Sequence, residues 1–312
     1  MRSEDAGGEE VKILVTGSSG YIGSWLVPKL LADGHEVVGV DTDWFGSAKV
    51  DNDKFQFIRC DVGSLLSKAA DVDAAIHLAM ISNNAMLEKD YALFTADRLM
   101  TLGFMRLVKK VPFVIYASSV AVYGSTTKPA TEDVFPKPTT RYGQSKKDGE
   151  YAAMDIGACI VRSASVVGRS ANMRFDITLN KMTHDAARNG VIKVNGGDQK
   201  RCHVTLEDLC DFYRLLLAKR PKGEAFNVVA ENQSVRDSAE MVAEATGAGI
   251  EYGPATDKRS YTASGAKAER FLGWKPKHSI KDEVFIMATM LKGGYWKDSA
   301  APRYWRMADA LA

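Results

Sequence analysis

The hydrophobic and polar positions near the start of the chain change their period twice. Residues 11–16 form a short β-branched apolar run, residues 21–32 repeat apolar side chains at helical spacing, and residues 35–40 form a second apolar run. Short continuous runs predict buried strands, and the periodic stretch between them predicts a helix. This part of the chain therefore predicts a strand, a turn, a helix and a second strand, which is the opening of a doubly wound sheet.

The same alternation continues through the first half of the chain. Strands that alternate with helices favour a parallel sheet covered by helices on both faces. The predicted fold class is therefore α/β, with a doubly wound parallel Rossmann sheet and a smaller C-terminal substrate-binding lobe. The further predicted elements are strands at 56–59, 74–78, 113–117 and 158–162 and helices at 91–110 and 145–154.

Domain boundaries follow from the point at which the alternation weakens. After residue 168 the elements become short and rich in Gly, Asn and Lys, although 208–219 still predicts a helix and 225–229 a strand. The first ten residues are polar and acidic. The predicted division is a disordered lead-in at 1–10, a Rossmann domain at 11–168 to which 201–229 returns, and a smaller lobe made of 169–200 and 230–312.

Composition and charge exclude several classes of protein. The net charge is +2 and no run of like charges occurs, so the sequence has no electrostatic footprint for nucleic acid or an anionic membrane. No apolar stretch approaches the ~20 residues that span a bilayer. We predict a cytoplasmic protein with no nucleic-acid, membrane or metal partner. Its cysteines form no C-x-x-C pair and are expected to be reduced thiols: Cys60, Cys159, Cys202 and Cys210.

A glycine-rich turn follows the first predicted strand. Residues 17–23 have the pattern G-x-x-G-x-x-G and open the first helix. Glycine lets a pyrophosphate approach the helix N-terminus, where free N–H groups and the helix dipole favour negative charge. Glycines alone are weak evidence, because any tight turn needs them, but the strand and helix around them indicate a dinucleotide site. Its candidate residues are Gly17, Gly20, Tyr21, Ile22 and Gly23.

An acidic residue ends the second predicted strand. The Asp41 carboxylate can accept hydrogen bonds from ribose hydroxyls and would repel a 2′-phosphate. Asp43 adds a second negative charge, and no arginine lies between Asp41 and Lys49. We therefore predict NAD rather than NADP as the cofactor. The alternative is that Asp41 only caps a turn.

A tyrosine and a lysine four residues apart suggest proton-transfer chemistry. Tyr142 and Lys146 share a face if this segment is helical. A nearby cation lowers the pKa of a phenol from ~10 toward neutrality, which suits proton transfer at physiological pH. The alternative is a surface tyrosine beside a solvated lysine. The strand at 113–117 supports the chemical interpretation, because it delivers Ser118 and Ser119 to the sheet edge where doubly wound proteins bind ligands.

With these features in place, the sequence resembles an extended short-chain dehydrogenase/reductase of the nucleotide-sugar epimerase and dehydratase branch. The shared segments run along nearly the whole chain and are specific for the superfamily, less so for the reaction. They are TGSSGYIG at 16–23, IHLAM at 76–80, ASSVAVYG at 117–124, YGQSK at 142–146 and SYTASGAKAERFLGWKP at 260–276.

The resemblance implies roles for single residues. Ser119 would be the catalytic hydroxyl, with Ser118 less favoured, and Tyr142 would be the general acid/base. Lys146 would hold the nicotinamide ribose and tune the phenol. The other implied NAD contacts are Asp61, Val62, Leu78, Ala79, Met80 and Ala117. The implied substrate contacts are Ser119, Tyr142, Ser165, Arg201, which would grip a diphosphate, and Arg259 as a weaker candidate for that task.

Three positions depart from the family pattern. Ser165 stands where the family often has asparagine, Thr205 where it usually has histidine, and Asp97 where asparagine is common. None belongs to the proposed catalytic trio. The first two leave the identity of the sugar open.

The resemblance also leaves the reaction open. Dehydratases of this branch resemble one another in carrying Asp-Glu after the catalytic Ser/Thr, and its decarboxylases place a Glu nearby. Here Val120 and Ala121 occupy those positions and cannot move protons. We therefore favour 4-epimerisation of a nucleotide-diphosphate (NDP) sugar through a transient 4-keto intermediate. The alternatives are an NDP-sugar dehydratase, decarboxylase or 4-ketoreductase, or, in another class, a dinucleotide-binding sensor or assembly factor.

The resemblance further implies a homodimer. Relatives dimerise through two helices that correspond here to 91–110 and 142–154. Apolar side chains of the first helix would form the seam, unless they only face the sheet. The expected seam residues are Leu93, Phe94, Leu102 and Met105.

Overall fold

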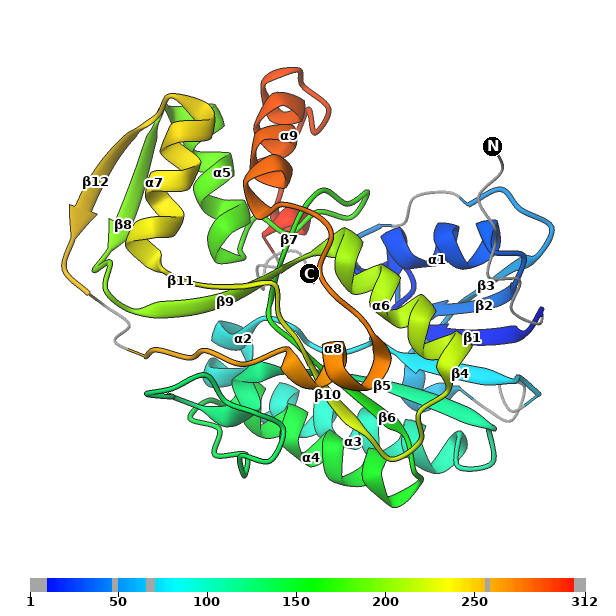
Figure 1. The fold of residues 1–312 in the computed structure, drawn as a ribbon. Coiled ribbons are helices and arrows are strands. Elements are labelled where there is room, and N and C mark those ends of the chain that lie inside the picture. The colour runs from blue at the N-terminus through cyan, green and yellow to red at the C-terminus, as the bar shows by residue number, and fades with distance from the viewer. Residues whose placement is uncertain (1–9, 47–49, 66–70, 256–258, 306–312) are drawn as a thin grey trace.

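Seven parallel strands form the main sheet of the computed structural model, which describes residues 10–46, 50–65, 71–255 and 259–305 (Figure 1). The predicted α/β class with a doubly wound sheet is confirmed. The strand order reverses between β4 and β1, which is where such sheets bind ligands. In spatial order the strands are β10 (Ala225–Val228), β6 (Cys159–Ser163), β5 (Phe113–Ser119), β4 (Ala74–His77), β1 (Lys12–Thr16), β2 (Glu36–Asp41) and β3 (Phe55–Arg59).

Helices cover both faces of the main sheet. In Figure 1, α1 (Gly23–Ala32) and α6 (Leu206–Lys219) lie on one face, and α3 (Tyr91–Leu107) and α4 (Arg141–Asp155) lie on the other. Alternate residues of β1 are buried on opposite sides: Ile13 packs with α1, and Leu14 with α3. Burial on both faces explains why the strands appear as continuous apolar runs in the sequence.

The smaller lobe contains two short sheets and three helices among the described residues, and in Figure 1 α7 and α5 lie beside β8 and β12. One sheet has two parallel strands and the other has three. Its elements are β7 (Ser165–Val167), β8 (Val191–Asn195), β9 (Lys200–Thr205), β11 (Glu231–Ser234), β12 (Gly249–Gly253), α5 (Thr178–Asn189), α7 (Val235–Thr246) and α9 (Ile280–Lys292).

The structure corrects the predicted return at 201–229. Residues up to Thr205 belong to β9, which is a strand of the three-stranded sheet. Within 201–229, therefore, only β10 is a strand of the main sheet, and α6 is the helix that precedes it. Residues beyond 230 also come back to it, because α8 (Ala266–Leu272) packs against β10. Aromatic contacts hold this arrangement: the Phe212 ring lies 5.9 Å from Phe226 and 5.0 Å from Trp274. The predicted lead-in, apart from Glu10, lies outside the described residues.

Two boundaries differ from the prediction for local reasons. Helix α4 begins at Arg141, before the predicted residue 145, because the Thr140 hydroxyl caps it by accepting a hydrogen bond from the Gly143 N–H (3.0 Å). Helix α1 begins at Gly23, because the glycine turn extends through Ile22. The remaining elements are α2 (Asn84–Lys89) and the 3₁₀ turns η1 (Val62–Ser64), η3 (Val120–Tyr123) and η4 (Pro302–Tyr304).

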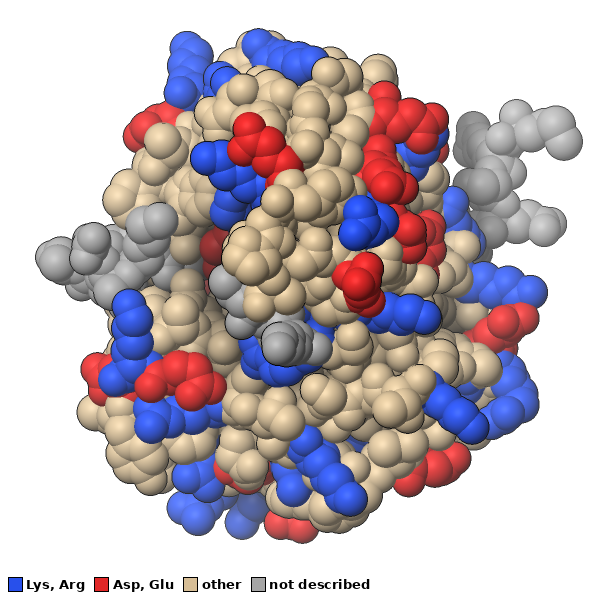
Figure 2. Space-filling model, turned by 90° about the vertical axis from the view of Figure 1, so that its left-hand side faces the viewer, with Lys and Arg blue, Asp and Glu red and all other residues tan. Residues whose placement is uncertain are grey.

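The surface carries charges of both signs. On the face drawn in Figure 2, basic and acidic side chains are interspersed among broad neutral areas. No helix within the described parts of the chain combines the length and the apolar character that crossing a bilayer would need.

Candidate active site

Two adjoining cavities lie at the ends of the central strands, with volumes of about 540 and 290 Å³. We call them the larger and the smaller cavity. Both are lined by residues of the glycine turn, by residues that follow β4 and by one arginine. The shared residues are Tyr21, Ile22, Leu78, Met80, Ser82 and Arg174.

The glycine turn lines the larger cavity and leaves no room for side chains. Gly17 has φ +73°, and a Cβ there would lie 2.7 Å from the Ala79 nitrogen. A Cβ on Gly23 would lie 2.2 Å from the Gly17 oxygen. The backbone of the turn therefore lies directly against the end of β4 and the start of α1, so that backbone N–H groups can face a ligand.

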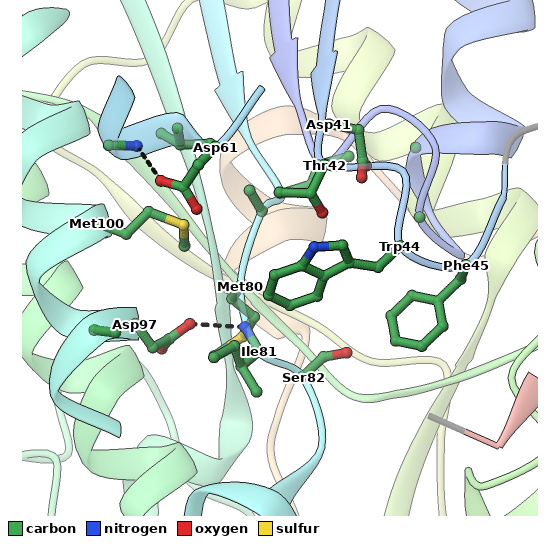
Figure 3. Close-up of a pocket in the computed structure, with 18 of the residues that line it drawn as sticks. Asp41, Thr42, Trp44, Phe45, Asp61, Met80, Ile81, Ser82, Asp97 and Met100 are labelled. Atoms are coloured by element: carbon green, nitrogen blue, oxygen red, sulfur yellow. Dashed lines mark hydrogen bonds between the residues drawn. The ribbon is translucent and has the colours of Figure 1, made fainter. Parts of the chain in front are cut away.

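Asp41 also lines the larger cavity, where it is labelled in Figure 3. Its carboxylate accepts hydrogen bonds from the backbone N–H of Ser19 (3.0 Å) and of Asp43 (2.9 Å). These contacts are the ones expected if Asp41 caps a turn, which was the alternative interpretation. The same carboxylate stands on the cavity wall, so the two interpretations are compatible, and its contact with a ribose stays a prediction.

The larger cavity has walls that the sequence reasoning missed. Figure 3 shows the ring of Trp44 between Thr42 and Met80, with the ring of Phe45 beside it. Opposite them, Met100 of α3 lines the cavity. The aromatic pair three and four residues after Asp41, the acid that ends β2, was the available signal. The predicted residues that line this cavity are Gly17, Gly20, Tyr21, Ile22, Gly23, Asp41, Asp61, Val62, Leu78, Ala79 and Met80.

The end of β5 separates the two candidate serines. The Ser119 hydroxyl accepts a hydrogen bond from the Ala121 N–H (3.2 Å) and forms one with the Tyr142 phenol. The Ser118 hydroxyl is buried and donates to the Glu150 carboxylate (2.5 Å). Ser119 is thus paired with Tyr142 at the smaller cavity, whereas the hydroxyl of Ser118 is engaged by a structural carboxylate.

Tyr142 lies in an environment that differs from the predicted one. Burial raises the pKa of its phenol, and the hydrogen bond with Ser119 and the charge of Arg174 lower it. The predicted effect of Lys146 on this pKa stays a prediction, and the largest favourable charge on the phenol in the structure is that of Arg174. The Lys146 ammonium instead donates a hydrogen bond to the Ala117 carbonyl oxygen.

Lys146 is buried beside two carboxylates. Burial lowers the pKa of its ammonium to about 8, and the charges of Asp97 and Glu150 oppose that shift. Asp97 accepts hydrogen bonds from the Ser145 hydroxyl (2.5 Å) and from the Ile81 N–H (2.7 Å; Figure 3). Burial raises the pKa of the Asp97 carboxyl. Asp97, which stands where asparagine is common in the family, therefore links α3 to the segment after β4 and to α4.

The predicted substrate contacts divide into two groups. Ser165 and Arg259 line the smaller cavity, together with Tyr261. Arg201 lines neither cavity: its guanidinium donates to the Arg259 carbonyl oxygen and lies 4.5 Å from the Tyr261 ring centroid. Thr205 is buried and caps α6, accepting from the Asp208 N–H (3.0 Å).

The smaller cavity also contains polar residues that no recognised motif includes. They come from the segment after β4, from the loop before α4, from the end of β6 and from the segment before α5. No described Asp or Glu lines this cavity. The additional polar residues are Ser82, Asn84, Thr140, Ser163 and Arg174.

Comparison with known proteins supplies independent findings. The model of the NAD dependent epimerase/dehydratase family matches residues 13–229. A UDP-glucose 4-epimerase of Lactobacillus helveticus is 28% identical, over 89% of this chain and 96% of that protein. A protein described as putative UDP-arabinose 4-epimerase 2 of Arabidopsis thaliana is 28% identical, over 94% of this chain and 83% of that protein.

Solved structures agree with these relatives. The structure of MoeE5 in complex with UDP-glucuronic acid and NAD has a TM-score of 0.82 and 26% identity, and the match covers 91% of this chain and 99% of that one. The UDP-glucuronic acid 4-epimerase from Bacillus cereus, in complex with UDP-glucuronic acid and NAD, has a TM-score of 0.80 and 26% identity, over 90% and 99% of the two chains.

Proposed function

The chain belongs to the NAD-dependent epimerase/dehydratase family, and from this membership and the two cavities we propose that it epimerises an NDP-sugar at C4. One observation carries the choice of reaction. The described lining of the smaller cavity includes Ser119 and Tyr142 but neither Asp nor Glu, and Val120 and Ala121 follow the serine. Epimerisation needs no second acid, whereas elimination of water or loss of CO₂ requires one to move a proton at another carbon.

NAD suits the larger cavity by the chemistry of its lining. The glycine turn, whose close backbone contacts exclude side chains, would hold the pyrophosphate. Asp41 would accept from the ribose, and the apolar slot near Val62 and Met100 would take the adenine. When bound, NAD accepts a hydride from the sugar carbon and returns it.

The remaining steps fall to side chains of the smaller cavity. Tyr142 would take the proton of the C4 hydroxyl and return it, and Ser119 would hold the reacting oxygen by a hydrogen bond. Lys146 would contact the nicotinamide ribose. Arg259 would contact the diphosphate, with Arg201 holding it from behind through the Arg259 carbonyl. We assign the sugar to the space between the main sheet and the smaller lobe.

We expect the purified protein to convert an NDP-hexose or NDP-pentose to its C4 epimer without added NADH. The hydride returns to the same carbon, so cofactor is regenerated at each turnover. In D₂O the product should carry no deuterium on carbon, because only the hydroxyl proton exchanges through Tyr142. Nuclear magnetic resonance of the product, with the same incubation in H₂O as reference, measures both results.

Other reactions of the family would give different products in this assay. A dehydratase or decarboxylase introduces solvent deuterium at carbon, and a ketoreductase shows no turnover until reduced cofactor and a keto-sugar are supplied. A sensor or assembly factor would bind NAD without reducing it, whichever NDP-sugar is offered. Any of these outcomes would contradict 4-epimerisation.

We also propose a homodimer through α3 and α4, with a different seam from the one expected. Phe94 and Met105 are buried within the chain and therefore face the protein interior, as the alternative held. Leu93 and Leu102 are half-buried. The exposed apolar side chains of the two helices are Tyr91, Leu99, Tyr151 and Met154.

Light scattering should report a particle of twice the 34.1 kDa chain mass at micromolar concentration. Met154→Glu should yield monomers, because a carboxylate buried in an apolar seam lacks a partner. Phe285→Glu on α9 alters an exposed apolar residue outside this face and should stay dimeric. A 34.1 kDa particle from the unaltered chain would refute the proposal.

A further inference from the structure

Arg174 stands where the two cavities meet. It lies between β7 and α5 and lines both cavities, and its side chain is 13% exposed. The guanidinium is held along one edge: Nε and Nη2 donate to the Asp176 carboxylate at 3.0 and 2.6 Å. Nη2 also donates to the Ser82 carbonyl oxygen at 3.3 Å. The orientation of the cation is therefore fixed before any ligand binds.

The third guanidinium nitrogen has no hydrogen-bond partner among the described residues. Nη1 forms no hydrogen bond with a residue that the structure describes, although the side chain is nearly buried. A guanidinium presents five N–H donors in a fixed fork, so two remain for the cavities. Asp176 and Ser82 therefore hold the positive charge of Arg174 in one orientation at the wall of both cavities.

The segment that carries Arg174 is anchored to the glycine turn. The Asn172 side-chain amide donates to the carbonyl oxygens of Ser19 (2.6 Å) and Gly46 (2.9 Å). The Ser170 hydroxyl donates to the Tyr21 carbonyl oxygen (2.8 Å). These contacts keep Arg174 in one place relative to both cavities.

Charges around the Tyr142 phenol act on its pKa in both directions. Burial and the Asp97 charge raise the pKa of the phenol, and Tyr261 adds to that effect. The hydrogen bond with Ser119 and the charge of Arg174 act in the opposite direction. No described carboxylate lines the smaller cavity to neutralise Arg174 there, and Asp176 occupies only one edge of the guanidinium.

We propose that Arg174 is a positioning residue for the proton transfer: a fixed cation at the junction of the cavities that stabilises the Tyr142 phenolate. In the step it assists, the proton of the sugar hydroxyl moves to the phenolate oxygen while Arg174 keeps its own protons. The inference rests on the proposed function, which assigns the proton transfer to Tyr142.

The test compares Arg174→Gln and Arg174→Lys in the NAD-bound protein without substrate. Phenolate formation is followed by near-ultraviolet absorbance as the pH is raised. The contribution of Tyr142 is the difference between each protein and the same protein with Tyr142→Phe added. We expect Arg174→Gln to move this titration up by about one pH unit, because a nearby positive charge favours the ionised phenolate. Arg174→Lys should recover part of the shift. Arg169→Gln is the matched control, since Arg169 belongs to the same segment, pairs with Glu283 (2.7 Å) and lines neither cavity.

A second measurement separates this role from a purely structural one. In Arg174→Gln the acid limb of the kcat profile should move to higher pH, with a smaller change in KM. If that variant does not fold, Asp176→Asn tests the same point with the opposite sign. The amide oxygen can still accept a hydrogen bond from Arg174, whereas the negative charge that offsets the guanidinium is lost, so Tyr142 should titrate at lower pH. An unchanged titration in the folded Arg174→Gln protein would overturn the inference. A shifted titration in a protein that converts no NDP-sugar would instead refute the proposed function alone.

Discussion

Tyr142→Phe should lower the turnover of an NDP-sugar by about 10²–10⁴-fold, the usual contribution of a positioned acid/base. The substitution removes one oxygen, and with it the hydrogen bond to Ser119 and the only group assigned to the hydroxyl proton. The ring stays, so the fold and the NAD content should be unchanged. Measuring kcat together with the NAD released on denaturation separates lost chemistry from lost binding.

The matched control is Tyr295→Phe. Tyr295 lies outside the proposed dimer seam, is 65% exposed and lines neither cavity, so loss of its hydroxyl should leave kcat unchanged. Near-normal turnover in Tyr142→Phe would show that another group moves the proton. In that case the shared wall of Ser119, Tyr142 and Lys146 would be a binding surface only.

The large sheet could be predicted because its central strands are buried on both faces. Ile13 and Leu14 are neighbours in sequence, and both are fully buried, on opposite sides of β1. A parallel strand of this kind produces a continuous apolar run, and the helices between such runs retain their own period. The glycine turn was equally visible, because backbone contact at Gly17 and Gly23 excludes every other residue.

The electrostatics of the site could not be predicted from spacing. Tyr-x-x-x-Lys places Tyr142 and Lys146 on one helix face, but the partner of the ammonium is the Ala117 carbonyl of β5. The cation that acts on the phenol belongs to Arg174, in a segment where the periodic pattern had weakened. Its position depends on the Ser82 carbonyl, far away in sequence, and such contacts leave no local periodicity.

The same limit applies to the small strands. The pattern around β9 is short and mixed, and its neighbours in space are β7 and β11 rather than the strands of the main sheet. Strand β9 is buried along most of its length but contains Lys, Arg and His, so it carries little hydrophobic signal. The predicted return to the main sheet was therefore placed at 201, one strand too early. The contact between the rings of Phe212 and Trp274, which accompanies the packing of α8 on the main sheet, also joins segments that are far apart in the sequence.

Arg162→Met should lower the free energy of unfolding by about 3–5 kcal/mol, the usual cost of breaking a buried ion pair from one side. Arg162 and Glu150 have side chains that are 3% and 1% exposed. Their two hydrogen bonds measure 2.9 and 2.7 Å, from Nε and Nη2. Without the arginine, the Ser118 hydroxyl would be the one remaining hydrogen-bond partner of the buried Glu150 carboxylate among the described residues. Urea unfolding followed by circular dichroism measures the change.

The double variant Arg162→Met with Glu150→Gln shows whether the uncompensated charge is the cause. Because the carboxylate leaves together with its partner, much of the lost stability should return, whereas a simple packing defect would persist in both proteins. Comparison of the single and double variants also separates the effect on stability from the effect on the pKa of Lys146. Glu150 supports the charge on Lys146 against burial, so the double variant should lower the pKa of that ammonium below about 8 while recovering stability. Surface substitutions usually change the free energy of unfolding by no more than about 0.5 kcal/mol. A change that small in Arg162→Met would contradict the expectation that this buried ion pair stabilises the fold.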